Sequence, residues 1–335
     1  MKTLLVDGDN LFKIGFHGVR EFYVDGNHIG GVFHFLNTLR KLLDENEYDK
    51  VIVFWDGKDN SIQRRELYPY YKLNRKNNMT EEKLQSYYSQ KNRVKQYLEE
   101  CFVRQIEIDG NEADDLVAYY CLISNGEKKT IFSSDRDYMQ LLSEEVSIYS
   151  PIQKYLYQFG DKVKLEKEWI PHQNIFVSKI MLGDKSDNIF GIYNLGEKTF
   201  IKLFPEVLER PVSINDILTK AKLLQEQSKD NKVLNNILNG VTKNGELGDM
   251  FYETNKRIVD LNNPMISEEA KELVTLYHKE ALDPEGRTSK NIIQMMTDDG
   301  FFKYLPKDDD SFVNFIRPIL KLTRKEKRKH KQTLN

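Results

Sequence analysis

Three apolar, β-rich stretches in the first half of the chain each end at or near an aspartate. These are Thr3–Val6 with Asp7, Val51–Trp55 with Asp56, and Thr130–Phe132 with Asp135. Ligands of an open α/β sheet bind beyond the carboxyl ends of its strands, so we expect the three carboxylates to meet at one edge of a sheet.

Two further motifs place carboxylates three residues apart, on a shared face. One pairs Glu112 with Asp115 at the start of a helix predicted over Ala113–Ile123; the other pairs Asp184 with Asp187. Asp114 and Asp137 complete the set of nine acids. Carboxylates gathered in one site repel each other and must take up protons unless a cation neutralises them. Hard oxygen ligands suit Mg²⁺ or Mn²⁺.

A phosphodiester is the substrate that such a site would suit. Two metal ions about 3.5–4 Å apart can activate water and stabilise the leaving oxygen, without a side-chain nucleophile. The sequence has neither a Gly-x-Ser-x-Gly elbow nor a Walker A loop. Each acid alone has an ordinary explanation, since Glu112 and Asp114 could simply cap a helix or complement its dipole. The hypothesis therefore depends on the whole set.

Composition limits the class of protein. The 335 residues include 50 Lys+Arg and 52 Asp+Glu, for a net charge of -2, and 39% are hydrophobic. No run is long enough for a membrane helix, and Asp7 and Asp9 interrupt any signal peptide at the start. Only Cys101 and Cys121 are cysteines, which disfavours disulfides and zinc and favours a reducing, intracellular setting.

Positive charge is concentrated in two segments. Residues 58–104 contain 11 Lys/Arg, 6 Asp/Glu and 6 tyrosines, and residues 321–331 contain 7 Lys/Arg and one glutamate. The first segment is either a solvated helical insertion or a nucleic-acid-binding one, since aromatic rings stack on bases and cations bind phosphates. The second is expected to be a disordered basic tail.

Strand-like and helix-like stretches alternate up to about residue 175, including a helix predicted over Gly31–Leu43, and the remainder reads as mainly helical. This order predicts an α/β fold with a mostly parallel sheet and flanking helices. The length predicts about two domains.

Taken in order, the acidic motifs resemble those of the structure-specific 5′-nuclease family, which includes flap endonucleases, the 5′-exonuclease domains of bacterial polymerases and phage 5′-nucleases. The resemblance covers residues 1 to about 205. It rests on the segments Leu5–Gly8, Val53–Asp56, Tyr71–Arg75, Glu112–Asp115, Ser133–Asp137 and Gly183–Ile189.

The resemblance implies a PIN-like (resolvase-like) catalytic domain over residues 1–180, with a helical arch at about 58–104. It implies a helical C-terminal domain over 181–320, with a helix–hairpin–helix at about 184–204, followed by the basic tail at 321–335.

The resemblance also implies site residues. Asp7, Asp56, Glu112, Asp114 and Asp115 would surround one Mg²⁺, and Asp135, Asp137, Asp184 and Asp187 a second, with Mn²⁺ as a substitute. Asp114 would be essential for catalysis. Lys72 would contact the scissile phosphate, Arg75 would bind a phosphate, and Tyr71 would either stack on a terminal base or pack in the core.

The segment Gly191–Thr199 resembles the helix–hairpin–helix, in which Gly191, Gly196, Lys198 and Thr199 would hold duplex backbone, with a possible K⁺ site. The glycines there are expected to supply left-handed backbone angles and close approach. Asn194 replaces a glycine and Tyr193 a proline, and asparagine tolerates the left-handed conformation. A plain turn between helices is the alternative.

Beyond residue 205 the resemblance favours phage RNase H-type 5′-nucleases. It implies an exonuclease or flap endonuclease that removes RNA primers or 5′ flaps in DNA replication and repair. Branched or RNA-primed duplex DNA would be the substrate, and a single-stranded DNA-binding protein and a sliding clamp would be partners. The protein would be a monomer without a membrane contact, in the cytoplasm of its cell or of a phage-infected host.

Three alternatives stay open at this stage. Asp7-Gly8-Asp9 resembles the nucleophile and acid of haloacid-dehalogenase-like phosphatases, although that class leaves Glu112–Asp115 and the basic insertion without a role. A non-catalytic branched-DNA-binding protein would gain nothing from so many acids. A single-strand RNA nuclease of the wider PIN group would not need the arch-like insertion.

Overall fold

A six-stranded sheet lies at the centre of the computed structural model, which describes residues 1–18, 22–24, 27–75, 78–228, 230–283, 286–305 and 311–333, apart from some side chains of the last helix. The strand order is β5-β4-β1-β6-β7-β8, and only β8 runs antiparallel to its neighbour. The strands are β1 (Lys2–Asp7), β4 (Lys50–Asp56), β5 (Arg104–Ile108), β6 (Lys128–Phe132), β7 (Val146–Ser150) and β8 (Tyr155–Tyr157). The predicted α/β fold with a mostly parallel sheet is confirmed.

Alternate residues of the central strands enter two separate cores, one on each face of the sheet. In β1, Leu5 belongs to one buried cluster while Leu4 and Val6 belong to the other, and β4 divides its side chains in the same way. Both faces are therefore covered, which explains why these strands read as continuous apolar runs in the sequence.

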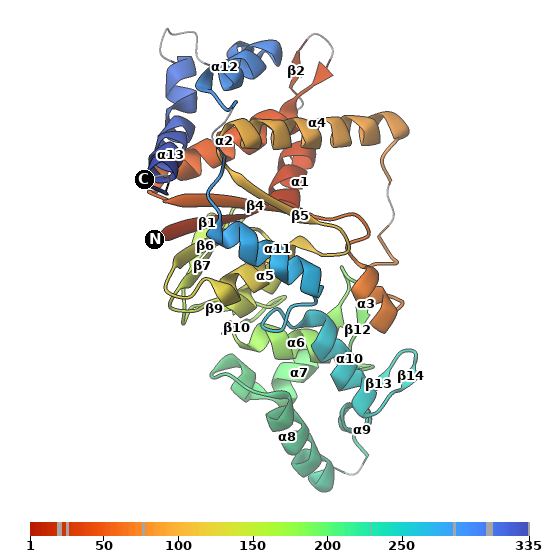
Figure 1. Cartoon of the computed structure of the whole chain (residues 1–335). Coiled ribbons are helices and arrows are strands. Elements are labelled where there is room, and N and C mark those ends of the chain that lie inside the picture. Colours follow the sequence, from red (N-terminus) through yellow and green to blue (C-terminus); the bar gives the residue numbers. More distant parts are fainter. Residues whose placement is uncertain are drawn as a thin grey trace.

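Helices from both ends of the chain cover the two faces (Figure 1). One face carries α1 (Gly8–Gly18), α2 (Gly30–Glu45), α4 (Glu81–Glu100), α12 (Ser289–Asp298) and α13 (Ser311–Thr333). The other face carries α5 (Ala113–Ile123) and α11 (Glu268–Lys279).

The remaining elements are short helices, small strand pairs and the helices that follow residue 173. The short helices are α3 (Ile62–Leu67), η1 (Arg136–Leu141), η2 (Pro205–Leu208) and η3 (Phe301–Lys303). Two small antiparallel pairs are β2 (Tyr23–Val24) with β3 (Asn27–His28) and β9 (Lys162–Lys164) with β10 (Trp169–Pro171). The lower part of Figure 1 holds α6 (Asn174–Leu182), β11 (Gly183–Asp184), β12 (Ile189–Phe190), α7 (Glu197–Leu203), α8 (Ile214–Gln227), α9 (Lys232–Leu238), β13 (Val241–Thr242), β14 (Gly245–Glu246) and α10 (Asp249–Val259).

The two cores do not follow the predicted division at residue 180. That boundary falls inside α6, and one buried cluster joins Leu5 of β1 to Phe200 of α7 and Val274 of α11. Local composition changed near residue 175 because strands give way to helices there, but the apolar faces of those helices pack onto the same core.

The C-terminal segment is helical rather than a disordered tail. Helix α13 runs to Thr333, and its residues Phe315, Ile316, Ile319 and Leu322 are buried in the core that includes α2. Disorder was expected from the positive charges, but the apolar residues at helical spacing pack this segment as a helix. Residues 334 and 335, together with several basic side chains of α13, lie outside the described residues.

Residues 58–104 form α3, a turn-rich loop and α4, as a helical insertion between β4 and β5; residues 76 and 77 lie outside the described set. Helix α4 is not fully solvated, because Val94, Tyr97 and Leu98 are buried. A carboxylate near the C-terminus holds it in place: Asp299 accepts from Arg93 Nε at 2.9 Å and from the Tyr97 hydroxyl at 2.7 Å.

Among the described residues, no helix combines the length and the hydropathy needed to cross a membrane.

Asp299→Ala should lower the free energy of unfolding by about 1–2 kcal/mol, because it leaves the Tyr97 hydroxyl and a partly buried guanidinium without their acceptor. Urea denaturation measures the loss. Asp298→Ala is the matched control, since its carboxylate accepts only an exposed hydrogen bond from Gln294 and the change should cost under about 0.5 kcal/mol. Equal losses in the two variants would contradict a role for the Asp299 contacts in fixing α4.

Candidate metal centre

The carboxyl ends of three adjacent strands bring the first acids together. Strands β4, β1 and β6 are neighbours in register, so Asp56, Asp7 and the loop after Phe132 share one edge of the sheet. Asp7 accepts from the Ser133 hydroxyl at 3.0 Å, and Asp56 accepts from the amide of Ala113 at 3.0 Å. The strand-end argument made from the sequence is therefore correct in its geometry.

One carboxylate cluster surrounds the start of α5. Ligand oxygens of Glu112, Asp114 and Asp115 lie within 4.8 Å of one another. Glu112 occupies the N-cap position but makes no capping hydrogen bond. Its two oxygens instead accept from four side chains: Ser61 at 3.0 Å, Lys72 at 2.6 Å, Arg64 at 2.8 Å and Tyr71 at 2.9 Å.

Asp115 differs from its neighbours in this cluster because it is already paired. Both of its oxygens accept from the buried guanidinium of Arg64, one of them at 3.0 Å, and Oδ1 also accepts from the amide of Met265 at 2.9 Å. This residue is fully buried. Its carboxylate therefore contributes to the centre in this structure mainly through Arg64.

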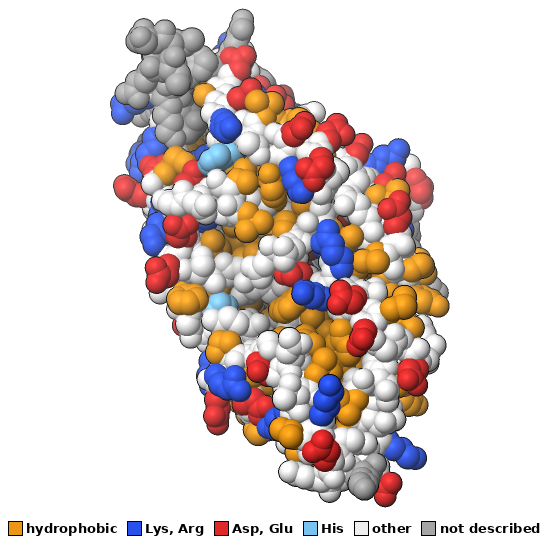
Figure 2. Space-filling model, turned by 60° about the horizontal axis from the view of Figure 1, so that its bottom comes forward, with side chains coloured by type: hydrophobic (Ala, Val, Ile, Leu, Met, Phe, Trp, Pro, Cys, Tyr) orange, Lys and Arg blue, Asp and Glu red, His pale blue; other side chains and the backbone are white. Residues whose placement is uncertain are grey.

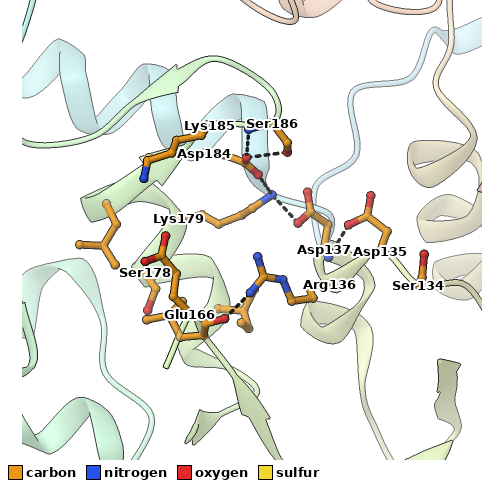
Figure 3. A pocket seen from close by; sticks show the side chains of 14 residues that line it. Ser134, Asp135, Arg136, Asp137, Glu166, Ser178, Lys179, Asp184, Lys185 and Ser186 are labelled. Atoms are coloured by element: carbon orange, nitrogen blue, oxygen red, sulfur yellow. Dashed lines mark hydrogen bonds and ion pairs between the residues drawn. The ribbon is translucent and has the colours of Figure 1, made fainter. Parts of the chain in front are cut away.

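The second cluster contains Asp137, Asp184 and Asp187, again with ligand oxygens within 4.8 Å of one another. Figure 3 shows the ammonium of Lys179 between Asp137 and Asp184, with an Nζ–Oδ2 distance of 2.7 Å to Asp184. These side chains line a pocket of about 430 Å³ that also includes Asp135. Asp187 pairs with Arg75.

Burial and mutual repulsion raise the proton affinity of several acids. Burial, with the charges of Asp56 and Asp135, raises the pKa of Asp7 to about 7. The side chain of Asp135 is exposed at the rim of the site, where partial desolvation of its carboxyl and the charge of Asp137 raise its pKa to about 6. The pKa of Asp114 is raised well above its usual value by burial and by Asp115 and Glu112. A divalent cation bound among these carboxylates would displace such protons and offset the repulsion between the acids.

Where a cation lies next to a carboxylate, the pKa of that carboxyl is lowered instead of raised. Burial alone would raise the pKa of Glu112, but Arg64 and Lys72 lower it overall. In the same way, Lys179 and the Ser186 hydroxyl lower the pKa of Asp184 despite its burial. These two carboxylates therefore remain charged.

The loop that carries Lys72 is fixed onto the second acidic motif. The amide of Lys72 donates to the carbonyl of Asp187 at 2.8 Å, and Asn188 Nδ2 donates to the carbonyl of Tyr70 at 2.7 Å. Lys72 has φ 55° and Asn188 φ 58°, an uncommon conformation for residues other than glycine. The two segments, more than 100 residues apart in sequence, thus position the lysine over Glu112.

Lys72 and Arg75 lie among the predicted acids, and Arg75 also donates to the carbonyl of Ser186 at 3.3 Å. Tyr71 is only 2% exposed and its hydroxyl donates to Glu112, so its ring is packed and not open for a base. Of the two roles considered for Tyr71, the structure favours packing beside the carboxylates.

The segment at 191–199 forms a tight connection between the β11–β12 hairpin and α7. Asn194 has φ 61°, as expected for its left-handed position, whereas Gly196 is extended with φ −98° and has open space where a Cβ would be. The expectation of a left-handed angle at Gly196 is therefore wrong, since it serves as the N-cap of α7. Gly191 is required for close approach, because a Cβ would meet the backbone of Leu182. Lys198 is exposed and Thr199 half-buried.

Sequence reasoning missed two cations at the centre. Arg64 reads like its neighbour Arg65, and nothing local marks it as the buried one. Lys179 left a weak signal, as the sole charge of the apolar helix α6, directly before an acidic loop. Lys91, which pairs with Asp9 at 2.7 Å, was counted only as part of a basic segment.

The donor set fits divalent metal ions. Every candidate ligand in the two clusters is a carboxylate oxygen. Desolvation and mutual repulsion raise the pKa of Asp114 there, and of Asp7 and Asp135 beside them. Hard oxygen donors match Mg²⁺ and Mn²⁺ better than softer ions. The fold and the site together are those of an α/β protein with a mostly parallel sheet and two carboxylate clusters that could hold divalent metal ions.

Comparison with known proteins identifies the family. A model described as "5′-3′ exonuclease, N-terminal resolvase-like domain" matches residues 2–170. The 5′-3′ exonuclease of Halalkalibacterium halodurans is 34% identical over 218 residues, which cover 61% of this chain and 69% of that protein. The chain belongs to the 5′-3′ exonuclease family, whose members are metal-dependent enzymes that hydrolyse phosphodiester bonds.

Longer relatives and solved structures agree with this assignment. DNA polymerase I of Rhizobium leguminosarum is 31% identical over 237 residues, 66% of this chain, but the match spans only 22% of the polymerase. A T5 protein co-crystallised with metal ions superposes with a TM-score of 0.62 at 20% identity, over 88% of this chain and 99% of that one. T5 5′-exonuclease with bound zinc gives a TM-score of 0.59 at 19% identity, over 90% and 99%. At these identities the structures support the fold alone.

The raised pKa values predict how stability depends on pH and metal. A carboxyl with a higher pKa in the folded chain than in the unfolded chain binds protons more tightly when folded, so it stabilises the fold at low pH and loses this contribution as pH rises through the folded pKa. For Asp135 and Asp7 these values are about 6 and about 7. The Tm of metal-free protein should therefore fall between pH 5 and 8, and Mg²⁺ should raise Tm more at pH 8 than at pH 5.

Thermal melts in a chelator, with and without added Mg²⁺, measure both effects. Asp7→Asn should flatten the metal-free pH profile, because the amide cannot titrate. A metal-free Tm that rises across this range, or a Mg²⁺ shift of equal size at both pH values, would contradict the account.

Proposed function

We propose that the protein is a Mg²⁺-dependent, structure-specific 5′-nuclease that cleaves branched or RNA-primed duplex DNA during replication and repair. The observation that carries this proposal is the pair of carboxylate clusters, with Asp7, Asp56 and Asp135 beside them, at the edge where Lys72 enters. Membership of the 5′-3′ exonuclease family supports the reaction type and the 5′ polarity.

The residues divide into two proposed ligand sets. Metal ions held there would activate water and stabilise the leaving oxygen of the phosphodiester. The first set is Asp7, Asp56, Glu112 and Asp114, together with Asp115, whose carboxylate is paired with Arg64. The second set is Asp135, Asp137, Asp184 and Asp187. Mn²⁺ is expected to replace Mg²⁺, because its ligand preferences are similar.

Cations already at the centre have proposed roles toward the substrate. Lys72 and Arg75 now pair with Glu112 and Asp187, and both pairs can open when a phosphate brings its own negative charge. Lys72 would then hold the scissile phosphate and Arg75 an adjacent one. Arg64 stays between Glu112 and Asp115 and orients the first cluster, because it is 4% exposed and out of reach of solvent.

A second pocket offers a route for the 5′ strand beneath the arch-like insertion. It has a volume of about 620 Å³, lies between α1, the end of β4 and α4, and includes Asp56 of the centre. Its lining combines cations with aromatic rings, as single-strand binding requires. These residues include Lys13, His17, Lys58, Tyr87, Tyr88, Lys91 and Lys95.

The phosphatase alternative requires a free Asp9, and the structure shows that both oxygens of Asp9 are hydrogen-bonded. Asp9 would have to act as an acid and base, but one oxygen accepts from Lys91 and the other from the amide of Asp56 at 2.9 Å. It therefore links α1, β4 and α4, and both of its oxygens are already hydrogen-bonded. A non-catalytic role disagrees with the family assignment.

The remaining features of the proposal follow the family resemblance. The 191–199 segment would hold duplex backbone through Lys198 and Thr199, with K⁺ as a possible aid. A single-stranded DNA-binding protein and a sliding clamp are proposed partners of a monomer, in the cytoplasm of its cell or of a phage-infected host.

Cleavage of a 5′-labelled substrate panel tests this function. With Mg²⁺, a 5′-flap or RNA-primed duplex should be cut near the junction, and Asp114→Asn should reduce turnover by roughly 100-fold or more, since even outer-shell changes at metal sites cost roughly 10- to 100-fold. Asparagine keeps the acceptor that the amide of Asp115 uses at 2.8 Å, so the fold should survive.

Asp44→Asn, an equivalent change on the exposed face of α2, serves as the control and should keep full activity. Cleavage that survives Asp114→Asn, or products from the 3′ end only, would refute the proposed function. Preference for unpaired RNA without a junction would instead favour the single-strand RNA nuclease.

A further inference from the structure

A short hairpin beyond the 191–199 segment has no role so far. Strands β13 and β14 pair through Val241 with Glu246 and Thr242 with Gly245. The Thr242 hydroxyl accepts from the amide of Asn244 at 3.1 Å and donates to the carbonyl of Gly245 at 3.3 Å. Thr242 is buried while Lys243 and Asn244 at the tip are exposed. The tip is thus internally braced and open to solvent.

This hairpin is hydrogen-bonded to the proposed duplex-binding loop. The amide of Tyr193 donates to the carbonyl of Val241 at 2.8 Å, and Asn236 Nδ2 donates to the carbonyl of Tyr193 at 2.9 Å. Tyr193 stands where the family pattern has a proline, and proline has no amide proton to donate. The departure from the pattern therefore supplies the bond that joins the two loops.

Lys243 is also placed relative to the metal centre. Its ammonium lies 3.9 Å from the centroid of the Phe190 ring, a cation–π contact. Phe190 belongs to β12, which pairs with the strand that carries Asp184. Phe190 also packs against Tyr70, at 5.4 Å between ring centroids, and Tyr70 is 47% exposed.

Tyr70, Phe190 and Lys243 thus form a chain of contacts that begins at the loop carrying Lys72. The hydrogen bond from the amide of Tyr193 to Val241 joins the same hairpin to the 191–196 turn. Tyr70 and Tyr193 are about half exposed. Figure 1 places the β13–β14 hairpin beside α10, on the same side of the molecule as α3 and β12. On the face drawn in Figure 2, Lys and Arg side chains are interspersed with Asp and Glu and do not merge into one basic surface.

We propose that the β13–β14 hairpin is a second contact for duplex DNA, in which Lys243 binds a backbone phosphate next to the one held by the 191–199 segment. The inference rests on the proposed function. An ammonium held on an aromatic ring, exposed on a braced tip, loses little freedom when it meets a phosphate. It neutralises one phosphate and carries no base specificity.

Salt-dependent binding measures such a contact directly. Fluorescence anisotropy with a labelled 5′-flap duplex, with Ca²⁺ replacing Mg²⁺, would be titrated between 50 and 200 mM salt, a range over which phosphate contacts change affinity strongly. Lys243→Ala should weaken binding roughly 3- to 5-fold, the size of an exposed ion pair, and reduce the slope of log K against log salt by about 1. Lys243→Arg should retain the wild-type slope.

Lys41→Ala is the matched control, since Lys41 is an exposed lysine of α2, beside the basic helix α13 on the opposite part of the molecule (Figure 1). An unchanged slope in Lys243→Ala, or an equal change in Lys41→Ala, would overturn the hairpin contact while the proposed function stands. If wild-type protein binds no branched duplex, the proposed function fails and the hairpin proposal fails with it.

Discussion

Repulsion among buried carboxylates at the ends of β1, β4 and β6 is the constraint on which the rest of the structure depends. Nine acids gather at this edge, and the fold opposes their charge with cations delivered from outside the sheet. These four cations come from three segments: Arg64 from α3, Lys72 and Arg75 from the loop after it, and Lys179 from α6. At Asp7 and Asp114, burial and the neighbouring carboxylates outweigh every stabilising contact and raise the pKa, so these carboxyls hold protons more tightly than they would in water. A divalent cation bound among these carboxylates would release the protons and relieve the repulsion.

The positions of these cations explain why distant segments of the chain are in contact at the centre. The loop at 68–75 docks onto the loop at 184–190 through backbone and side-chain hydrogen bonds, so the insertion between β4 and β5 and the helical region after α6 become one unit at the centre. Farther along α4, Arg93 and Tyr97 are fixed by Asp299, a residue that lies beyond residues 2–170, the range matched by the family model. The C-terminal helices α12 and α13 thus support the insertion from the face of the sheet opposite α5.

The sequence allowed the fold class and the acids to be predicted, because strand ends in a parallel sheet converge whatever the connections between them. The helix predicted over Ala113–Ile123 agrees with α5, and the position of Asn194 agrees with its backbone angle. Long-range pairing could not be predicted: Arg64 and Arg65 are adjacent and chemically identical, and only the packing of α3 decides which one is buried. Strands β5 and β7 were missed because Arg104–Ile108 and Val146–Ser150 alternate polar and apolar residues over only five positions. The charge of residues 321–331 similarly obscured the apolar stripe that makes α13 a packed helix.

The central claim is that the two carboxylate clusters are a metal centre whose present cations are partly substitutes for divalent ions. Anomalous diffraction from a crystal soaked in Mn²⁺ tests it most directly. The account predicts two manganese peaks per chain, one among Asp7, Asp56, Glu112 and Asp114 and one among Asp135, Asp137, Asp184 and Asp187, with Lys179 moved away from at least one of its two aspartates. A crystal with no manganese at either cluster, and with every ion pair of the centre unchanged, would contradict it.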